Sequence, residues 1–427
     1  MEEYRARIAD QMLAELLEVT GGVLVQGPKW CGKTTTAAQA ARSKLYMDDP
    51  DTREQNLALA DTNIRQLLAG ETPRLIDEWE LAPKLWDAAR FEIDHHAPHV
   101  GRFIFTGSSV PKERDQKQIT HSGAGRFSML KMRTMSLWES GDSSGEVSLK
   151  DLFEGGKANA TQGKKNLTDI AYLICRGGWP GALRLKNKAA LKIAQSYLQI
   201  VANTDINAID DKKRDSEFMM RIIRSLARHQ GGQVPISTLY ADLSSNAQRS
   251  MSEDTIDNYI NVLKGIFLEE DMRAWNPNLR SRTAIRTSDT RYFTDPSIAT
   301  AALGIGPDDL MNNLETFGLI FETLAVRDLR VYADAIDGEV FHYRDKNKLE
   351  CDAVVHLQNS HYGLIEIKLG GDRLIEAGAS TLKTLASKID TQRMNEPSFL
   401  MVLTAIGQYA YQRPDGVLVV PITVLKN

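Results

Sequence analysis

The segment from Gly27 to Thr34 reads Gly-Pro-Lys-Trp-Cys-Gly-Lys-Thr and matches the phosphate-binding pattern GxxxxGK[ST]. The apolar run Val23-Leu24-Val25 precedes it, and the helix-forming sequence Thr-Ala-Ala-Gln-Ala-Ala follows it at 36–41. The pattern needs this order of strand, loop and helix, because loop N–H groups and the helix N-terminus must both face the phosphates. The sequence therefore predicts an α/β fold that begins with a nucleotide-binding loop.

Each fixed residue of this loop has a predicted role in binding ATP and Mg²⁺. Gly27 and Gly32 allow the backbone to curve around the β- and γ-phosphates. Lys33 neutralises phosphate charge and Thr34 supplies a hydroxyl for Mg²⁺. With the adjoining Thr35, these residues form the predicted nucleotide-binding set.

An acid pair follows the loop by about forty residues, at the end of the strand-like Arg74-Leu75-Ile76-Asp77-Glu78. A Mg²⁺-ATP site needs carboxylates opposite its phosphate loop. Asp77 is predicted to hold the metal through water, and Glu78 to polarise the attacking water. Lys33 and Glu78 are thus predicted catalytic residues.

The composition is that of a globular chain with about three domains in 427 residues. Hydrophobic residues make up 42%, charged residues 25%, and the net charge is −4, which argues against a wholly basic nucleic-acid binder. Three scattered cysteines without metal spacing indicate free thiols. The acidic start and the lack of a long apolar stretch favour a cytoplasmic protein with no membrane partner.

Two further segments resemble AAA+ ATPases. Phe103-Ile104-Phe105 runs into Thr106-Gly107-Ser108-Ser109, and Gly123-Ala124-Gly125-Arg126-Phe127 comes later. The resemblance implies that Ser108 senses the γ-phosphate, with Thr106 and Ser109 as alternatives, or that the segment is a plain turn. It also implies that Arg126 is an arginine finger that reaches a neighbouring subunit's ATP in a ring, with a hexamer favoured. The alternative is an exposed arginine at a helix end.

The segment Arg176-Gly177-Gly178-Trp179-Pro180-Gly181 resembles the AAA+ lid motif. Relatives place a sensing arginine after this proline, whereas this chain has Gly181, so Arg176 or Arg184 are substitutes. A helix-breaking turn explains the same residues without ATP. The polar stretch 139–165 is predicted to be an exposed linker. We therefore predict an ATPase core at 1–145 and a linker with helical lid at 146–205.

Residues 206–304 contain three amphipathic helical patterns followed by strand-like sequence and resemble a winged helix-turn-helix. The predicted recognition helix, Thr255 to Lys264, carries Asp257 and follows Asp254, which disfavours major-groove reading. A fold used for packing or partner contact is the alternative. Five arginines follow and could hold a phosphate backbone or form a solvated hairpin: Arg273, Arg280, Arg282, Arg286 and Arg291.

The last predicted domain, 305–427, resembles the PD-(D/E)XK nuclease core. Asp352 opens one strand, and Glu366-x-Lys368 closes the next, with Glu366 and Lys368 on one face. The resemblance implies a second metal site in which Asp352 and Glu366 bind Mg²⁺, Lys368 activates water and Glu322 joins from a helix.

The order of these parts resembles a prokaryotic AAA+ family with a C-terminal domain of unknown function. The leading hypothesis is an ATPase that couples hydrolysis to binding or remodelling DNA, including branched or single-stranded DNA, as an oligomeric ring. The second hypothesis is an ATP-gated, metal-dependent DNA nuclease. The third is a nucleotide-switched protein-interaction or signalling module.

Overall fold

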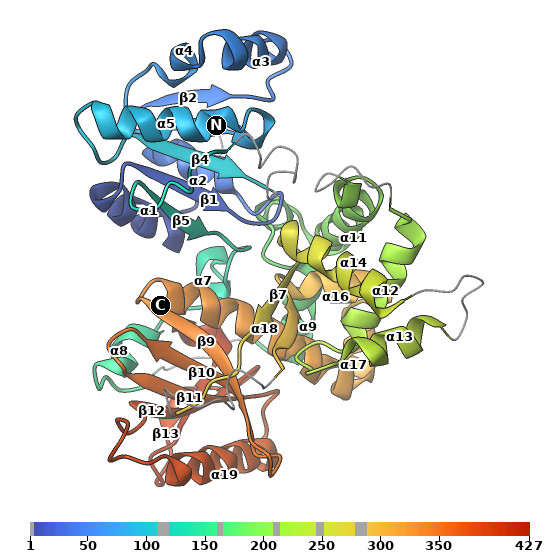
Figure 1. Ribbon diagram of the computed structural model, residues 1–427. Coiled ribbons are helices and arrows are strands. Elements are labelled where there is room, and N and C mark those ends of the chain that lie inside the picture. The colour runs from blue at the N-terminus through green and yellow to red at the C-terminus, as the bar shows by residue number, and fades with distance from the viewer. Residues whose placement is uncertain (1–3, 109–118, 160–164, 208–213, 245–251, 278–287) are drawn as a thin grey trace. The chain divides into compact units, whose positions relative to one another are not determined.

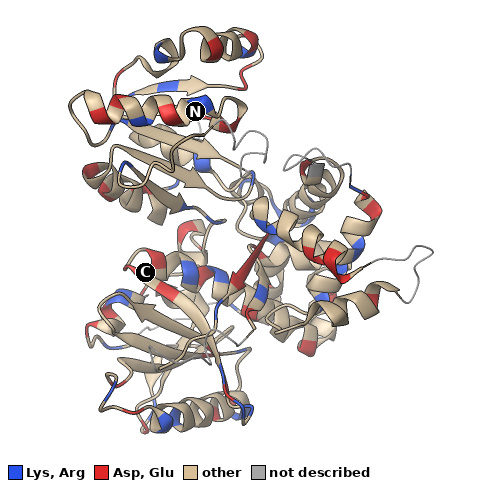
Figure 2. Ribbon diagram, in the orientation of Figure 1, with Lys and Arg blue, Asp and Glu red and all other residues tan. Residues whose placement is uncertain are grey.

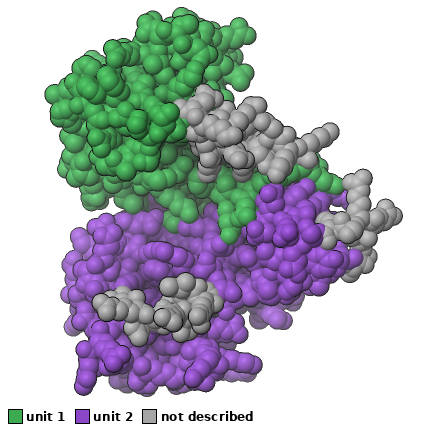
Figure 3. All heavy atoms as spheres, viewed as in Figure 1, with its two compact units in different colours: residues 1–134, 200–216, 261–268 green, residues 135–199, 217–260, 269–427 purple. Residues whose placement is uncertain are grey.

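The computed structural model describes residues 4–108, 119–159, 165–207, 214–244, 252–277 and 288–427. The chain divides into two compact units, coloured separately in Figure 3. Unit 1 comprises residues 1–134, 200–216 and 261–268, and unit 2 comprises 135–199, 217–260 and 269–427. This division cuts across the four predicted domains, because residues 135–199 make their contacts with the C-terminal part of the chain.

Unit 1 is built on a five-stranded parallel sheet with the order β2-β3-β4-β1-β5 (Figure 1). Its strands are β1 (Gly22–Gln26), β2 (Ser43–Tyr46), β3 (Arg74–Asp77), β4 (Phe103–Gly107) and β5 (Phe127–Lys131). Because the strands are parallel, their carboxyl ends share one edge of the sheet. Strand β1 lies between β4 and β5, with β3 on the far side of β4, so the Gly27–Thr34 loop lies near the carboxyl ends of β4 and β3. The predicted α/β fold is confirmed here.

Side-chain alternation gives this sheet two apolar faces. Val23 and Val25 pack with α1 and α2, whereas Leu24 packs on the opposite side with α3, α4 and α5. Trp79 and Trp86 lie in the second of these cores. The helices are α1 (Ile8–Val19), α2 (Lys33–Ala40), α3 (Arg53–Thr62), α4 (Ile64–Leu68) and α5 (Lys84–His95). Both faces are covered, so functional groups are confined to the sheet edge.

The first part of unit 2 is helical. Its elements are α7 (Leu137–Ser140), β6 (Val147–Ser148), α8 (Leu149–Phe153), α9 (Leu167–Arg176), α10 (Pro180–Leu183), α12 (Ser216–Arg228), α13 (Ile236–Ser244), β7 (Glu269–Met272), β8 (Thr290–Phe293), α16 (Pro296–Leu303) and α17 (Pro307–Asn312). Helices α11 (Asn187–Asn203) and α14 (Glu253–Gly265) cross the unit boundary. Strands β7 and β8 pair antiparallel. Three helices, α12 to α14, therefore precede a two-stranded ribbon.

The second part of unit 2 is a six-stranded mixed sheet with the order β13-β14-β12-β11-β10-β9. Val354 and Leu364 lie in a hydrophobic core with residues of α19. Val355 and Ile365 are also buried, but on the opposite face of the sheet. Helix α18 contacts β9, β10 and β11. The elements are α18 (Leu314–Asp334), β9 (Gly338–Arg344), β10 (Glu350–Leu357), β11 (Tyr362–Lys368), α19 (Asp372–Lys388), β12 (Phe399–Thr404), β13 (Tyr411–Gln412), β14 (Leu418–Pro421) and β15 (Leu425–Lys426).

The Gly-Gly-Trp-Pro turn predicted as an ATPase lid motif lies within unit 2. The Gly178 N–H donates to Asp295 at 2.8 Å, and the Trp179 indole N–H donates to Ser297 at 2.9 Å. Asp295 also pairs with the buried Arg327 of α18 at 3.2 Å. Hydrogen bonds thus connect the turn to α16, and Asp295 connects it further to α18. Among the described residues, no helix combines the length and apolar character that a membrane crossing requires.

Candidate nucleotide-binding site

The loop Gly27–Thr34, called the P-loop below, joins β1 to α2 in a conformation that two glycines permit. Gly27 has φ of 158°, and a Cβ at this position would lie 2.0 Å from the carbonyl oxygen of Met132. Gly32 caps α2 with φ of 103°. An L side chain at Gly32 would be strained by this φ, and one at Gly27 would also clash with backbone.

Lys33 is the first residue of α2 and is buried. Its ammonium group donates to the carbonyl oxygens of Gly27 and Pro28, each at 2.9 Å. The positive charge is therefore held inside the turn of the P-loop by neutral acceptors. Because no carboxylate hydrogen-bonds to it among the described residues, the charge is available to an anion.

Two side chains from outside the P-loop, those of Arg7 and Asp205, contact it and were not predicted from the sequence. Arg7, buried ahead of α1, donates to the carbonyls of Cys31 at 2.8 Å and Arg133 at 2.9 Å. Lys29 pairs at 2.8 Å with Asp205 of the returning segment 200–216. Arg7 and Asp205 are both distant from the P-loop in sequence, so no local pattern could have indicated these contacts.

Asp77, at the end of β3, lies directly across from the P-loop. Its Oδ1 accepts a hydrogen bond from the Thr34 hydroxyl at 2.8 Å and a short one from the Thr106 hydroxyl. Burial raises the pKa of Asp77, and these two hydrogen bonds oppose the rise. A carboxylate and a hydroxyl in contact form an oxygen-only donor pair suited to Mg²⁺. The predicted metal-binding pair, Thr34 and Asp77, is brought together.

Glu78 follows Asp77 with a left-handed backbone, φ 52°, which is unusual for glutamate. Burial raises its pKa, and the charge of Asp77 raises it further. The 3-10 turn η1 (Trp79–Leu81) comes next and brings Glu80 to the end of β4. There Glu80 accepts a hydrogen bond from the Ser108 N–H at 3.0 Å. Glu80 was missed in the sequence because only Asp77 and Glu78 fit the usual strand-end pattern.

The other predicted residues of this site differ in their surroundings. Ser108 is buried and touches the site through its backbone N–H, whereas Thr106 bonds to Asp77 through its side chain. Thr35 is exposed on α2. Arg126 is 46% exposed and pairs with Asp94 of α5 at 2.8 Å. Ser109 lies outside the described residues. Thr106 is thus the strand-end hydroxyl with a direct contact to Asp77.

A second group of charged residues occupies the sheet of unit 2. The Lys368 ammonium pairs with Asp352 at 2.9 Å and with Glu366 at 2.7 Å. Asp352 sits in a register irregularity between Cys351 and Val354, which turns it toward β11. We call Asp352, Glu366 and Lys368 the lysine–carboxylate cluster.

Glu322 of α18 accepts a hydrogen bond from the Tyr292 hydroxyl at 2.6 Å. Burial and then the charge of Asp352 raise its pKa to about 8. The same two causes raise the pKa of Glu366 to about 7. Within the described ranges, no group of three or more His, Cys, Asp or Glu side chains is placed to hold a metal ion. Of the predicted second metal set, Asp352 and Glu366 both contact Lys368, and the charge of Asp352 acts on Glu322.

The charge around the two-stranded ribbon is mixed. Strand β7 carries Glu269, Glu270 and Asp271 and is drawn red in Figure 2. Of the predicted arginine cluster, Arg273 pairs with Glu339 and Arg291 lies 4.0 Å from Asp271. The remaining three, Arg280, Arg282 and Arg286, lie outside the described residues. The described arginines of this cluster are thus engaged with acids.

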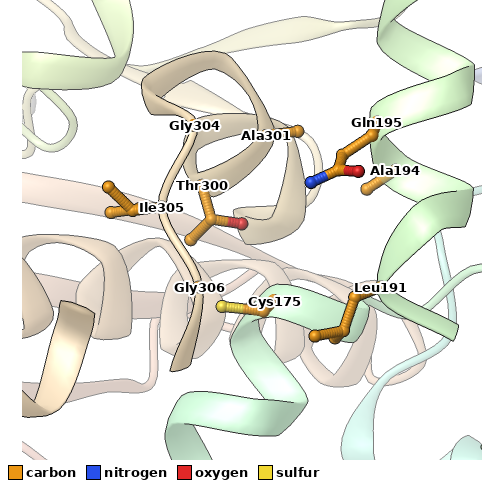
Figure 4. A pocket seen from close by; sticks show the side chains of 9 residues that line it. All are labelled: Cys175, Leu191, Ala194, Gln195, Thr300, Ala301, Gly304, Ile305 and Gly306. Carbon is orange, nitrogen blue, oxygen red and sulfur yellow. The ribbon is translucent and has the colours of Figure 1, made fainter. Parts of the chain in front are cut away.

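A small cavity of about 120 Å³ lies among α9, α11 and α16, within unit 2. Figure 4 shows its lining, in which the Cys175 thiol, the Thr300 hydroxyl and the Gln195 amide supply polar atoms among small apolar groups. Burial raises the pKa of Cys175 to about 12, so the thiol stays protonated. This cavity lacks charged side chains and is unsuited to a nucleotide phosphate.

The parallel sheet, the P-loop and the acid at the end of β3 together define a P-loop nucleotide-binding fold. Residues 20–140 match a family model described as an AAA domain, so this part of the chain has the AAA-type P-loop ATPase fold. Residues 167–309 and 317–425 match two models, each described as a domain of unknown function, DUF8612 and DUF4143. A comparison with curated proteins gives no match.

Several solved structures resemble the chain weakly. The Walker-type ATPase of Pyrococcus abyssi is 14% identical, with a TM-score of 0.40 over 69% of this chain and 94% of that one. A Thermotoga maritima RuvB variant is 16% identical, with a TM-score of 0.25 over 61% and 87%. The Aeropyrum pernix ORC1 protein, solved with DNA, is 13% identical, with a TM-score of 0.22 over 74% and 95%. Scores this low say nothing about function.

Proposed function

We propose that the protein is an ATPase that hydrolyses ATP with Mg²⁺ and couples hydrolysis to binding or remodelling DNA as an oligomeric ring. The observation that carries the ATPase part is the contact of Asp77 with Thr34 and Thr106 opposite a buried Lys33. Cation, metal-binding acid and hydroxyl come from three elements that meet only at this sheet edge.

Each residue has a role that follows from its position. Lys33 and the N-terminus of α2 neutralise phosphate charge, and Thr34 and Asp77 would hold Mg²⁺. The metal would supply charge stabilisation to the phosphate oxygens. Glu78 orients and polarises the attacking water, and its raised pKa suits it to accept a proton. Mixing Glu78→Gln protein with ATP should give tight binding with turnover reduced about 100-fold. Turnover equal to wild type would contradict this assignment.

Arg126 is proposed to act on the ATP of a neighbouring subunit. Its guanidinium is half-exposed and pairs with Asp94, as does Arg90 at 2.8 Å, so Arg90 is a matched control. We expect Arg126→Ala and Lys33→Ala each to lack ATPase activity and a mixture of the two to regain part of it. The recovery arises because mixed rings contain sites with an intact lysine from one subunit and an intact arginine from the next.

The control Arg90→Ala should retain activity on its own. An inactive mixture, together with a monomeric mass in the presence of ATP, would contradict the ring. Solution mass should therefore be measured with and without ATP for wild type and Glu78→Gln.

DNA binding is supported by the arrangement of α12, α13 and α14 followed by the β7–β8 ribbon, which resembles a winged helix-turn-helix. The acids of α14 and β7 disfavour insertion of α14 into the major groove, because carboxylates repel the phosphates that flank it. Gel shifts and ATPase assays with single-stranded, duplex and branched DNA at low and high salt test this proposal. Binding that weakens with salt and stimulates ATPase activity supports it. Tight ATP binding without any DNA effect would favour a nucleotide-switched interaction module instead.

A nuclease is the second candidate, because Asp352, Glu366 and Lys368 meet on adjacent strands. Both carboxylates contact the single Lys368 ammonium, which a metal ion would have to displace. Incubating supercoiled plasmid with Mg²⁺ or Mn²⁺ tests the candidate, with Asp352→Ala as the comparison. Cleavage that disappears in this variant would establish a nuclease.

A further inference from the structure

Glu80 joins two parts of the nucleotide site that the chain keeps apart in sequence. It lies on η1, the turn that begins directly after Glu78, and its Oε1 accepts the N–H of Ser108 at the end of β4. Thr106, two residues earlier on β4, donates to Asp77. Through these two hydrogen bonds, the end of β4 contacts both β3 and the η1 turn that follows it.

The second carboxylate oxygen of Glu80 faces the same strand end. Among the described residues, Glu80 Oε2 and the indole N–H of Trp79 are both buried without a hydrogen-bond partner. Both lie close to Gly107: a Cβ there would be 2.9 Å from Oε2 and 3.2 Å from Trp79 Nε1. Leaving such atoms without partners costs about 1–3 kcal/mol each. The carboxyl group of Glu80 is thus enclosed at the end of β4, and its hydrogen bond with Ser108 joins η1 to that strand end.

We propose that Glu80 is a positioning residue for ATP hydrolysis, which fixes the β4 end that carries Thr106 and Ser108 against the turn that carries Glu78. This inference rests on the proposed ATPase function. Its contact acts on the relative placement of the water-polarising Glu78 and the phosphate-sensing strand end. Misplacement of reacting groups by about 1 Å can cost 100-fold in rate, so the contact should affect turnover more than ATP binding.

The test compares variants that separate the hydrogen bond from the charge. Glu80→Ala removes the acceptor, Glu80→Gln keeps an acceptor oxygen without charge, and Glu80→Asp keeps the charge but shortens the reach. We expect Ala and Asp to lower kcat at least about 10-fold with KM within about 3-fold, and Gln to retain most of kcat. Gly107→Ala should resemble Glu80→Ala, because its methyl group would displace the carboxylate without removing a polar group.

A second readout does not depend on hydrolysis. In the protein without nucleotide, amide hydrogen exchange at Ser108 should accelerate in Glu80→Ala and stay slow in Glu80→Gln. The proposal is overturned if Gln loses as much turnover as Ala, if KM rises while kcat holds, or if Ser108 exchange is unchanged in Ala. A wild-type protein that binds no ATP would instead contradict the proposed function, while the exchange result would still test the contact.

Discussion

The P-loop site and the lysine–carboxylate cluster both gather a lysine and acids at strand ends, yet they neutralise charge in opposite ways. Lys33 is bonded to backbone carbonyls and Asp77 to threonine hydroxyls. Within the described part of the chain, neither hydrogen-bonds a group of opposite charge. Lys368 is bonded directly to Asp352 and Glu366. Neutral partners hold a charge in place and leave it free for a ligand, whereas ion pairs satisfy it internally.

This contrast indicates which of the two groups of residues is prepared for a charged ligand. A triphosphate with its metal can enter the P-loop site by exchanging neutral hydrogen bonds for charged ones. A metal ion entering the cluster must first separate two ion pairs at 2.7 and 2.9 Å. Similar residue types therefore differ in how available their charges are, according to what surrounds them.

The largest expected effect comes from removing the P-loop cation. Lys33→Ala should weaken ATP binding or turnover at least about 100-fold, because a preorganised positive charge beside the phosphates is lost. Lys29→Ala, on the same loop but paired with Asp205, should stay within a few-fold of wild type. Nucleotide titration and steady-state ATPase rates measure both. Equal losses would mean that loop charge in general, rather than the placement of Lys33, matters.

The second prediction exchanges one acid in each region. Asp77→Asn should reduce ATPase turnover by about 100-fold with little loss of stability, because burial already disfavours the Asp77 charge. Asp352→Asn should leave turnover within about 2-fold and lower the free energy of unfolding of unit 2 by about 1–2 kcal/mol, since Lys368 loses one ion pair. Turnover and denaturant unfolding give the two readouts. If both variants lost turnover equally, the distinction between the regions would fail.

The smallest effect concerns pH. The folded-state pKa values of Glu322 and Glu366, about 8 and about 7, lie above the ordinary value of 4.5. The folded state therefore binds these protons more tightly than the unfolded state, and stability should fall as pH rises from about 5 to 8. The pKa of Lys368 is also raised, but its contribution is lost only at much higher pH.

Hydrogen exchange of the β10 and β11 amides at pH 5.5 and 8.5 measures this dependence. Glu322→Gln should flatten the pH slope and be more stable than wild type at pH 8.5. An unchanged slope would show that Glu322 is ionised normally and that the cluster is more open to water than its contacts indicate.

Sequence patterns alone predicted the P-loop, its place between a strand and a helix, and the acid at the end of a second strand. These features are local: the glycine spacing, the alternation of Val23, Leu24 and Val25, and the order of residues in Arg74–Glu78 are set by neighbouring positions. It also indicated which residues of the last domain would approach one another, because Asp352 and Glu366 lie on adjacent strands.

The partners of each charged group became known only from the folded structure. The decisive contacts join residues that are distant in the chain. They are the P-loop contacts of Arg7 and Asp205, the hydrogen bond of Glu80 with Ser108, and the two ion pairs of Lys368. It also placed the Gly-Gly-Trp-Pro turn in unit 2. Hydrogen bonds and ion pairs depend on distances of a few ångströms, which the packing of helices and sheets fixes and a one-dimensional pattern does not encode.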